Sequence, residues 1–186
     1  LHEDRDAFLD VISQTRIEKN IASSIIEKDY YVTMLLKELS LTDVDFVFKG
    51  GTSLAKCYHA IDRFSEDIDL TVLQKPTQAR RKYIKESILA AGNRLHLELM
   101  NPSDIRSRRD FHRYVFCYPN AATDAMISNR IIIELFVAIR PFPVEKRRID
   151  SLVYQTMEKH RLVHEIREYG LDEFSMPVQS IQRTFI

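Results

Sequence analysis

The sequence is poor in the residues that mark several classes of protein. Its 186 residues include two cysteines, Cys57 and Cys117, and no tryptophan. Two cysteines provide neither a disulfide framework nor a zinc-binding pattern. No apolar run approaches the roughly 18 residues of a membrane span, and no signal peptide is visible. These absences argue against a disulfide-rich or membrane-spanning protein and favour a reducing, cytoplasmic setting.

An excess of charge of either sign is also lacking. The chain has 27 basic and 27 acidic residues, so its formal net charge is zero. Bulk charge therefore neither supports nor excludes a nucleic-acid partner. Short basic runs occur at 80–82, 106–109 and 146–148, but such runs more often solvate a surface than contact RNA. With 45% hydrophobic residues, the chain has the composition of one sizeable globular domain.

The two ends of the chain look cut. The sequence begins at Leu1 rather than at a methionine, and its last residues, from Ser180, resemble a helix cap and first turn. A single turn is not stable alone, so we expect the natural protein to continue. We predict N-terminal helices over 1–42 that pack on a core domain over 43–186.

A glycine-containing stretch is the centre of the sequence. Residues 46–48 are apolar and β-favouring, as in a buried strand. Gly50 and Gly51 then allow a sharp turn and a close approach to a ligand. Thr52 and Ser53 are good helix caps, and a helix start offers backbone N–H groups to an anion. This order of residues predicts strand, turn and helix, with a phosphate-binding turn between them.

An acidic strand follows this helix. Residues 67–72 alternate polar and apolar side chains, which places Asp67 and Asp69 on one face. Two adjacent carboxylates repel each other unless a cation lies between them. Hard oxygen ligands favour Mg²⁺, which commonly binds carboxylates together with substrate phosphates. A phosphate turn beside an acidic pair predicts phosphoryl or nucleotidyl transfer.

Glu134 is a third candidate carboxylate, because it interrupts the most apolar segment of the chain, 131–137. A carboxylate in such a strand is unfavourable unless it is paired or binds a metal. By itself, Glu134 fits a salt bridge with an arginine as well as it fits a metal site. Its occurrence together with Asp67 and Asp69 favours the metal site.

The other elements follow from hydrophobic periodicity and from breakers. We expect a mixed sheet flanked by helices, an α+β fold. Glu27–Tyr30, a polar segment in an otherwise apolar helix, faces either the ligand cleft or solvent. Gly92 is expected to end a helix as its C′ residue. The predicted helices are 3–20, 23–40, 76–91 and 145–169, and the further strands are 95–100, 114–118 and 130–139.

Two segments of the sequence resemble a known family. K-G-G-T-S-L, followed by Lys56 and Tyr58, and then R-F-S-E-D-I-D-L resemble the AbiEii/AbiGii toxin family of nucleotidyltransferases, within the DNA polymerase β-like nucleotidyltransferase superfamily. Supporting matches are E-K-D-Y upstream, I-E-L around Glu134, and S-I-Q-R-T-F at the end, so the likeness covers about 25–186. Neither G-G nor D-x-D alone would be specific, but both in this order are.

The resemblance implies a toxin of an abortive-infection or type IV toxin–antitoxin system, with a possible cognate antitoxin. It implies transfer of a nucleotide from an NTP, in some members to tRNA, with two Mg²⁺ ions or Mn²⁺ in their place. Members also continue beyond R-T-F into a helical region with a lysine and an aspartate. Carried over by motif, Gly50, Gly51, Thr52 and Ser53 hold the triphosphate, while Asp67, Asp69 and Glu134 bind metal.

Three basic residues near the turn are weaker candidates. Lys49, Lys56 and Arg63 could contact phosphate or the acceptor, although a surface salt bridge explains each of them more simply.

Three classes of function remain open at this point. The favoured class is an enzyme that adds nucleotides to RNA, with tRNA as the acceptor that the resemblance implies. The second is an enzyme of the same fold that nucleotidylates a protein or a small molecule such as an aminoglycoside. The third is a non-catalytic nucleotide-binding module, which three intact carboxylates argue against. The sequence does not determine the oligomeric state.

Overall fold

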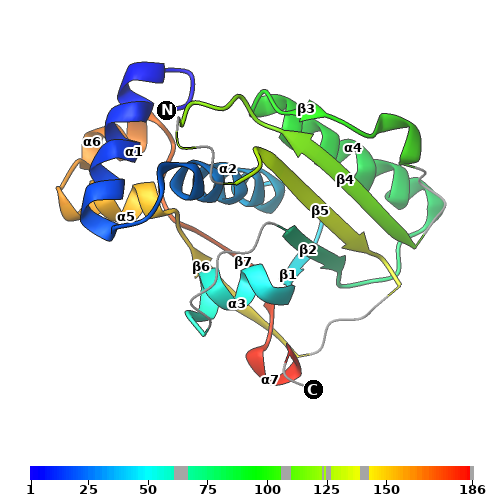
Figure 1. Ribbon diagram of the computed structural model, residues 1–186. Coiled ribbons are helices and arrows are strands. Elements are labelled where there is room, and N and C mark those ends of the chain that lie inside the picture. Colours follow the sequence, from blue (N-terminus) through cyan, green and yellow to red (C-terminus); the bar gives the residue numbers. More distant parts are fainter. Residues whose placement is uncertain (61–66, 106–109, 123, 125–126, 139–142, 185–186) are drawn as a thin grey trace.

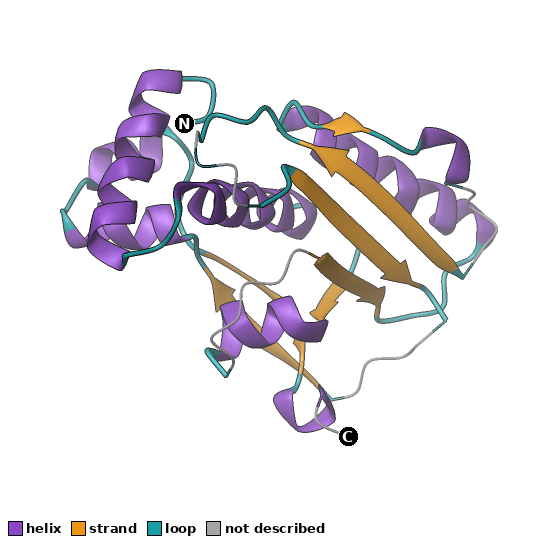
Figure 2. Cartoon of the chain, viewed as in Figure 1, coloured by secondary structure: helices purple, strands orange, loops and turns teal. Residues whose placement is uncertain are grey.

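A seven-stranded mixed sheet forms the centre of the described chain, with strand order β3-β4-β5-β2-β1-β7-β6 (Figures 1 and 2). The computed structural model describes residues 1–60, 67–105, 110–122, 124, 127–138 and 143–184. The strands are β1 (Phe46–Lys49), β2 (Asp67–Val72), β3 (Glu98–Leu99), β4 (Phe111–Cys117), β5 (Arg130–Phe136), β6 (Val144–Ile149) and β7 (Phe174–Gln179). The predicted α+β class is confirmed.

Helices cover both faces of this sheet. They are α1 (Arg5–Lys19), α2 (Ser23–Ser40), α3 (Gly50–Tyr58), α4 (Gln78–Arg94), α5 (Leu152–Lys159), α6 (Val163–Glu168) and α7 (Ile181–Thr184), with a short 3₁₀ turn η1 (Pro102–Asp104). Figure 1 shows α4 behind β3 and β4, with α2 beside it. Helix α3 contacts β1 and β2, and in Figure 2 it lies in front of β6 and β7. None of the described helices has the length and hydrophobicity of a membrane span.

The alternation of residues in β2 and β5 separates a packed face of the sheet from a polar one. The apolar residues on the packed face are at most 1% exposed and belong to the same core cluster as residues of α2 and α4; they are Ile68, Leu70, Ile133 and Leu135. The residues between them in sequence are partly exposed on the opposite face. The two strands pair in parallel, so this second face carries their polar side chains next to one another.

Helix α2 is buried nearly all round, as its sequence predicts, and this includes its polar segment. The residues from Glu27 to Tyr30 are each no more than 5% exposed. The two carboxylate oxygens of Glu27 accept the backbone N–H groups of Ala121 at 2.7 Å and Ala122 at 2.9 Å. Burial raises the pKa of Glu27, and these two donors act against that shift. The segment is therefore buried and does not face solvent, and the carboxylates of Glu27 and Asp29 both accept backbone N–H groups.

Gly92 does not end its helix, contrary to the sequence prediction. Helix α4 continues to Arg94, and Gly92 lies inside it without exposure of its own. A Cβ atom at Gly92 would lie 2.5 Å from Cε1 of Phe116 in β4. Glycine is present because the helix and the aromatic ring approach closely, not because the backbone needs a left-handed residue.

The predicted helix over 145–169 was wrong in its first part. Residues 144–149 form strand β6, which pairs antiparallel with β7. The charges that suggested a solvated helix belong to a strand at the edge of the sheet, where alternate side chains face solvent. Strand β7 was not predicted at all, and the strand expected at 95–100 is reduced to Glu98–Leu99.

Candidate active site

Two of the predicted carboxylates lie side by side on the polar face of the sheet. In the parallel pairing of β2 with β5, Asp69 is directly opposite Glu134. The side chain of Asp69 is 25% exposed and that of Glu134 is 31% exposed. Asp67 precedes Asp69 by one pleat, so it faces the same way. The alternation in the sequence therefore predicted this face correctly, and the strand pairing adds Glu134 to it.

The glycine turn lies against one of these carboxylates. Gly50 has a φ of +75° at the start of α3, and a Cβ atom there would lie 2.0 Å from Oδ2 of Asp69. Only glycine fits this position, for its backbone conformation and for space. Gly51 follows it in the first turn of α3. The turn predicted to bind phosphate is thus in direct contact with the carboxylate strand.

The hydroxyl groups of Thr52 and Ser53 stabilise this turn. Thr52 Oγ1 donates to the backbone oxygen of Asp67 at 2.5 Å, and Ser53 Oγ donates to the backbone oxygen of Gly50 at 2.8 Å. Both residues are buried. The side chain of Lys49, the N-cap residue, accepts no hydrogen bond from the first N–H groups of α3. An anion at this turn would therefore meet backbone N–H groups. The Thr52 hydroxyl holds α3 against β2, and the Ser53 hydroxyl closes the first turn of α3.

A row of four charges crosses the sheet through these carboxylates. Lys49 of β1 is opposite Asp69, and Arg113 of β4 is opposite Glu134, so the order is Lys49, Asp69, Glu134, Arg113. The ammonium of Lys49 lies 4.0 Å from Asp69, and Nε of Arg113 lies 3.8 Å from Glu134. Each carboxylate thus lies between a cation and the other carboxylate.

Burial raises the pKa of Asp69 above that of an ordinary aspartate. The charge of Asp67 adds to this effect, and Lys49 opposes it. A half-buried carboxylate whose ionisation is disfavoured gains most from a bound cation. Asp69 is therefore a carboxylate that a positive ligand would stabilise.

The donor set suits a hard divalent cation, because all three candidate ligands are carboxylates. As the side chains stand, no group of three or more His, Cys, Asp or Glu residues in the described part of the chain is arranged to hold a metal ion. Asp69 and Glu134 are adjacent, but Asp67 does not join them in a group of three that could hold a metal ion. The metal ligands remain a prediction.

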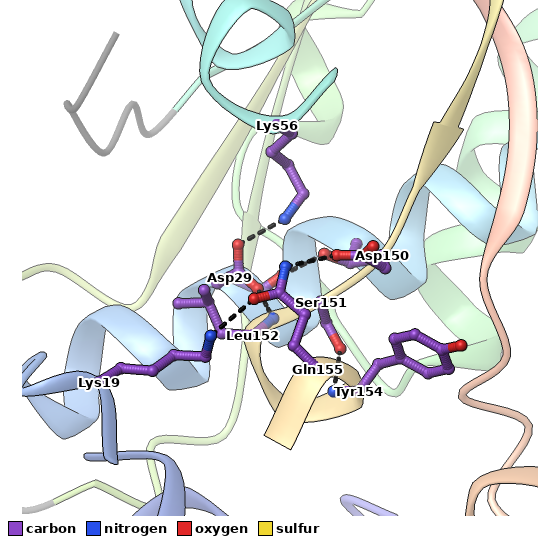
Figure 3. A network of polar contacts seen from close by, with 9 residues as sticks. Lys19, Asp29, Lys56, Asp150, Ser151, Leu152, Tyr154 and Gln155 are labelled. Atoms are coloured by element: carbon purple, nitrogen blue, oxygen red, sulfur yellow. Dashed lines mark hydrogen bonds and ion pairs between the residues drawn. The ribbon is translucent and has the colours of Figure 1, made fainter. Parts of the chain in front are cut away.

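Lys56 has a structural role that the sequence did not reveal. Its ammonium lies 2.5 Å from Oδ1 of Asp29 in α2, and both side chains are at most 10% exposed. Oδ2 of Asp29 accepts the backbone N–H of Leu152 at 2.8 Å, at the start of α5 (Figure 3). Asp29 thus joins three helices. The salt bridge considered for Lys56 is present, although it is buried and not at the surface. A contact of Lys56 with phosphate stays a prediction.

Replacing Lys56 by Met is expected to lower the free energy of unfolding by about 3–5 kcal/mol, because it leaves the buried charge of Asp29 without its partner. The double variant Lys56→Met, Asp29→Asn removes both charges and is expected to recover part of this loss. Urea denaturation of the single and double variants measures the coupling.

The exposed pair Lys82–Glu86, 3.7 Å apart on α4, provides the control. Lys82→Met is expected to change stability by less than about 1 kcal/mol. The cycle also needs the single variant Asp29→Asn. If the double variant lost as much stability as Lys56→Met and Asp29→Asn together, the two charges would not be coupled and the assigned role would be wrong.

Two residues of this region were missed or misplaced by sequence reasoning. Arg113 fell just before the strand predicted at 114–118, whereas Phe111–Cys117 alternates exposed and buried residues and forms the strand. Asp29 stood in a segment whose polarity within an apolar helix was the available signal. Arg63 lies outside the described residues, so its predicted contact with phosphate stays a prediction.

The profile of the family described as nucleotidyl transferase AbiEii toxin, type IV toxin–antitoxin system, matches residues 34–186. Proteins of curated function give no significant match. Among solved structures, the chain is similar to a Helicobacter pylori protein provisionally assigned as a nucleotidyltransferase. That match has 17% identity and a TM-score of 0.51, and covers 88% of this chain and 57% of the other. A likeness at this level supports the fold.

Two further structures are similar over comparable lengths. JHP933 from Helicobacter pylori has 16% identity and a TM-score of 0.49, covering 88% of this chain and 55% of that one. MenT4, a nucleotidyltransferase toxin from Mycobacterium tuberculosis, has 21% identity and a TM-score of 0.45, covering 86% and 49%. The chain spans about half of the length of the solved structures that it matches.

Proposed function

Since the chain belongs to the AbiEii nucleotidyl transferase toxin family of type IV toxin–antitoxin systems, we propose that it transfers a nucleoside monophosphate from an NTP to an acceptor hydroxyl of RNA. The acceptor class includes tRNA. In this proposal the reaction depends on Mg²⁺, the protein acts as a toxin in the cytoplasm, and a cognate antitoxin restrains it.

One observation carries this proposal more than any other. Asp69 is paired with Glu134 across two strands and is in contact with the Gly50 turn at the start of α3. A helix start suits the phosphates of an NTP, and neighbouring carboxylates suit the cations that accompany them. The proximity of a helix start to a pair of carboxylates therefore supports a nucleotidyl-transfer site at this place.

The chemistry follows from these groups. An oxygen of the acceptor hydroxyl forms a bond to the α-phosphorus of the NTP, the bond from that phosphorus to the bridging oxygen breaks, and pyrophosphate leaves with the electron pair. The hydroxyl proton passes to Glu134 or to water. Asp67, Asp69 and Glu134 would hold Mg²⁺, which supplies activation of the hydroxyl and neutralisation of charge on the triphosphate. The N–H groups at the start of α3 would orient the phosphates.

A labelling experiment tests the proposal. The full-length protein is incubated with each of the four α-labelled NTPs, total tRNA and cell extract, with Mg²⁺ or with EDTA. We expect label in RNA, with Mg²⁺ and not with EDTA. Label in protein or in a small molecule would favour a different acceptor for the same chemistry. Binding of NTP without transfer to any acceptor would contradict enzymatic function.

A further inference from the structure

The charge row is bordered on the polar face by two aromatic rings. Phe136 follows Glu134 by one pleat in β5, and Phe111 is its partner in β4. The two ring centroids are 4.6 Å apart, with 41° between the ring planes. The ammonium of Lys49 lies 4.7 Å from the centroid of Phe136. Phe136 is therefore fixed between Lys49 and Phe111, next to the carboxylates.

Phe111 is the exposed member of this pair. It retains 41% of its exposure, and its partner is half-buried. Together the two rings form a small apolar surface at the edge of the polar site. Phe111 is held in position by Phe136 beneath it, and one pleat further along β4 stands Arg113, whose side chain is 51% exposed.

Phe111 and Arg113 are two residues apart on the exposed side of β4, and a ring and a guanidinium together can bind the base and the phosphate of a nucleotide. Bases stack on aromatic rings without need of a particular sequence, and arginine binds a phosphate through two hydrogen bonds. Arg113 is 3.8 Å from Glu134, at the outer limit of an ion pair. Engagement of Glu134 by a cation would leave this guanidinium available to an anion.

We propose that Phe111 and Arg113 bind the terminal nucleotide of a single-stranded nucleic-acid acceptor, with the base on the ring of Phe111 and the phosphate on Arg113. This inference rests on the proposed function, because it assigns the acceptor side of the same site. It places the acceptor over β4 and β5, on the far side of Glu134 from the glycine turn. The NTP and the acceptor then approach the carboxylates from opposite directions.

A peptide acceptor fits these groups less well. A peptide segment would pair with the edge of β4, but the side chain of Asn101 occupies part of that edge. Asn101 donates to the backbone oxygen of Arg113 and accepts from the backbone N–H of Val115, each at 2.9 Å. These contacts replace the ones that an added strand would make there. Within the part of the chain that the structure describes, the ring of Phe111 and the guanidinium of Arg113 are exposed on the face of the sheet.

The first test measures binding apart from transfer. A fluorescein-labelled 12-nucleotide single-stranded RNA is titrated with the full-length protein, and anisotropy gives the dissociation constant. Phe111→Ala is expected to weaken binding by roughly 5- to 150-fold, the range found for loss of one base–aromatic stack. Phe111→Tyr keeps the ring and is expected to bind like the wild type. A DNA oligonucleotide of the same sequence shows whether the ribose hydroxyl contributes.

Tyr83 provides a matched control. Tyr83 is 40% exposed, and Cζ of Arg80 lies 4.9 Å from the centroid of its ring. It belongs to α4, on the other face of the sheet. Tyr83→Ala therefore removes an exposed ring beside an arginine at a site away from the carboxylates. It is expected to leave RNA binding unchanged. Equal losses for Phe111→Ala and Tyr83→Ala would overturn the assignment of Phe111.

The cation is tested by salt dependence. Arg113→Gln is expected to reduce the slope of log affinity against log salt by about 0.7, the value for one phosphate contact on a single strand. In transfer assays, both variants should raise KM for RNA and leave KM for NTP unchanged. A rise in KM for NTP alone would overturn the inference while leaving the proposed function intact.

Failure of the proposed function gives a different result. In that case the wild type would transfer no label to RNA, yet the binding measurement would still report on Phe111 and Arg113. If the wild type bound neither oligonucleotide, or if the peptide fraction of a cell extract became labelled instead, the nucleic-acid acceptor would be excluded.

Discussion

Replacing Asp69 by Asn is expected to reduce nucleotidyl transfer by roughly 10³-fold or more. Loss of an outer partner of a metal ligand already lowers activity by about 10- to 100-fold, and Asp69 is proposed as a direct ligand. It is central in the charge row, opposite Glu134 and against Gly50. The amide keeps the shape of the side chain but not the charge. Incorporation of labelled nucleotide at saturating Mg²⁺ measures the effect.

The same substitution is expected to leave the fold as stable as before, or more stable. Burial raises the pKa of Asp69 in the folded chain, so the folded state retains this proton to higher pH than the unfolded state. Ionisation of Asp69 therefore opposes folding as pH rises. The Asn variant lacks this effect, and its free energy of unfolding should equal or exceed that of the wild type at neutral pH.

The difference in stability should disappear in acid. Below the pKa of an unfolded aspartate, about 3.9, the wild-type side chain is protonated in both states and carries no charge in either. Urea denaturation in EDTA at neutral and acid pH measures this change. Asp10→Asn, an exposed residue of α1, serves as the control for activity. Transfer at the wild-type rate by Asp69→Asn would exclude Asp69 as a metal ligand.

The central part of the site could be predicted because local pattern determines it. Alternation over 67–72 places two carboxylates on one face whatever the rest of the fold does. Glu134 was recognisable because a carboxylate within an apolar strand needs a partner. Strand pairing is what brings Glu134 opposite Asp69, and the sequence could only infer that pairing from the chemistry.

Contacts between distant elements could not be predicted in the same way. A salt bridge was the simpler explanation for Lys56 from the sequence, but its partner Asp29 in α2 could not be identified there. Gly92 was read as a helix end, although a ring from β4 explains it. Both residues obey constraints set by elements that are remote in sequence. Such constraints leave no periodic signal, and only the packed structure shows them.

Replacing Gly50 by Ala is expected to lower transfer by roughly 10²-fold, the effect of a misplacement of about 1 Å in a catalytic group. The new Cβ atom would lie 2.0 Å from Oδ2 of Asp69. Either the carboxylate or the turn must move, and both belong to the proposed site. The residue would also hold a φ of +75°, which is unfavourable for alanine by about 1–2 kcal/mol.

Gly170 separates these two effects of the substitution. It has a φ of +62°, but a Cβ atom there would meet nothing within 4 Å. Gly170→Ala should therefore lose about 1–2 kcal/mol of stability from backbone strain alone and retain full activity. Thermal or urea denaturation gives the loss for each variant, and labelled NTP gives the activity.

Comparison of the two glycine variants tests whether the turn and the carboxylate form one site. If Gly50→Ala lost only the stability that Gly170→Ala loses and transferred nucleotide normally, contact between the turn and Asp69 would not matter for the reaction. A selective loss of activity by Gly50→Ala would instead mean that Asp69 can take its position only because residue 50 has no side chain. Glycine at this position would then be required for catalytic geometry as well as for its backbone conformation.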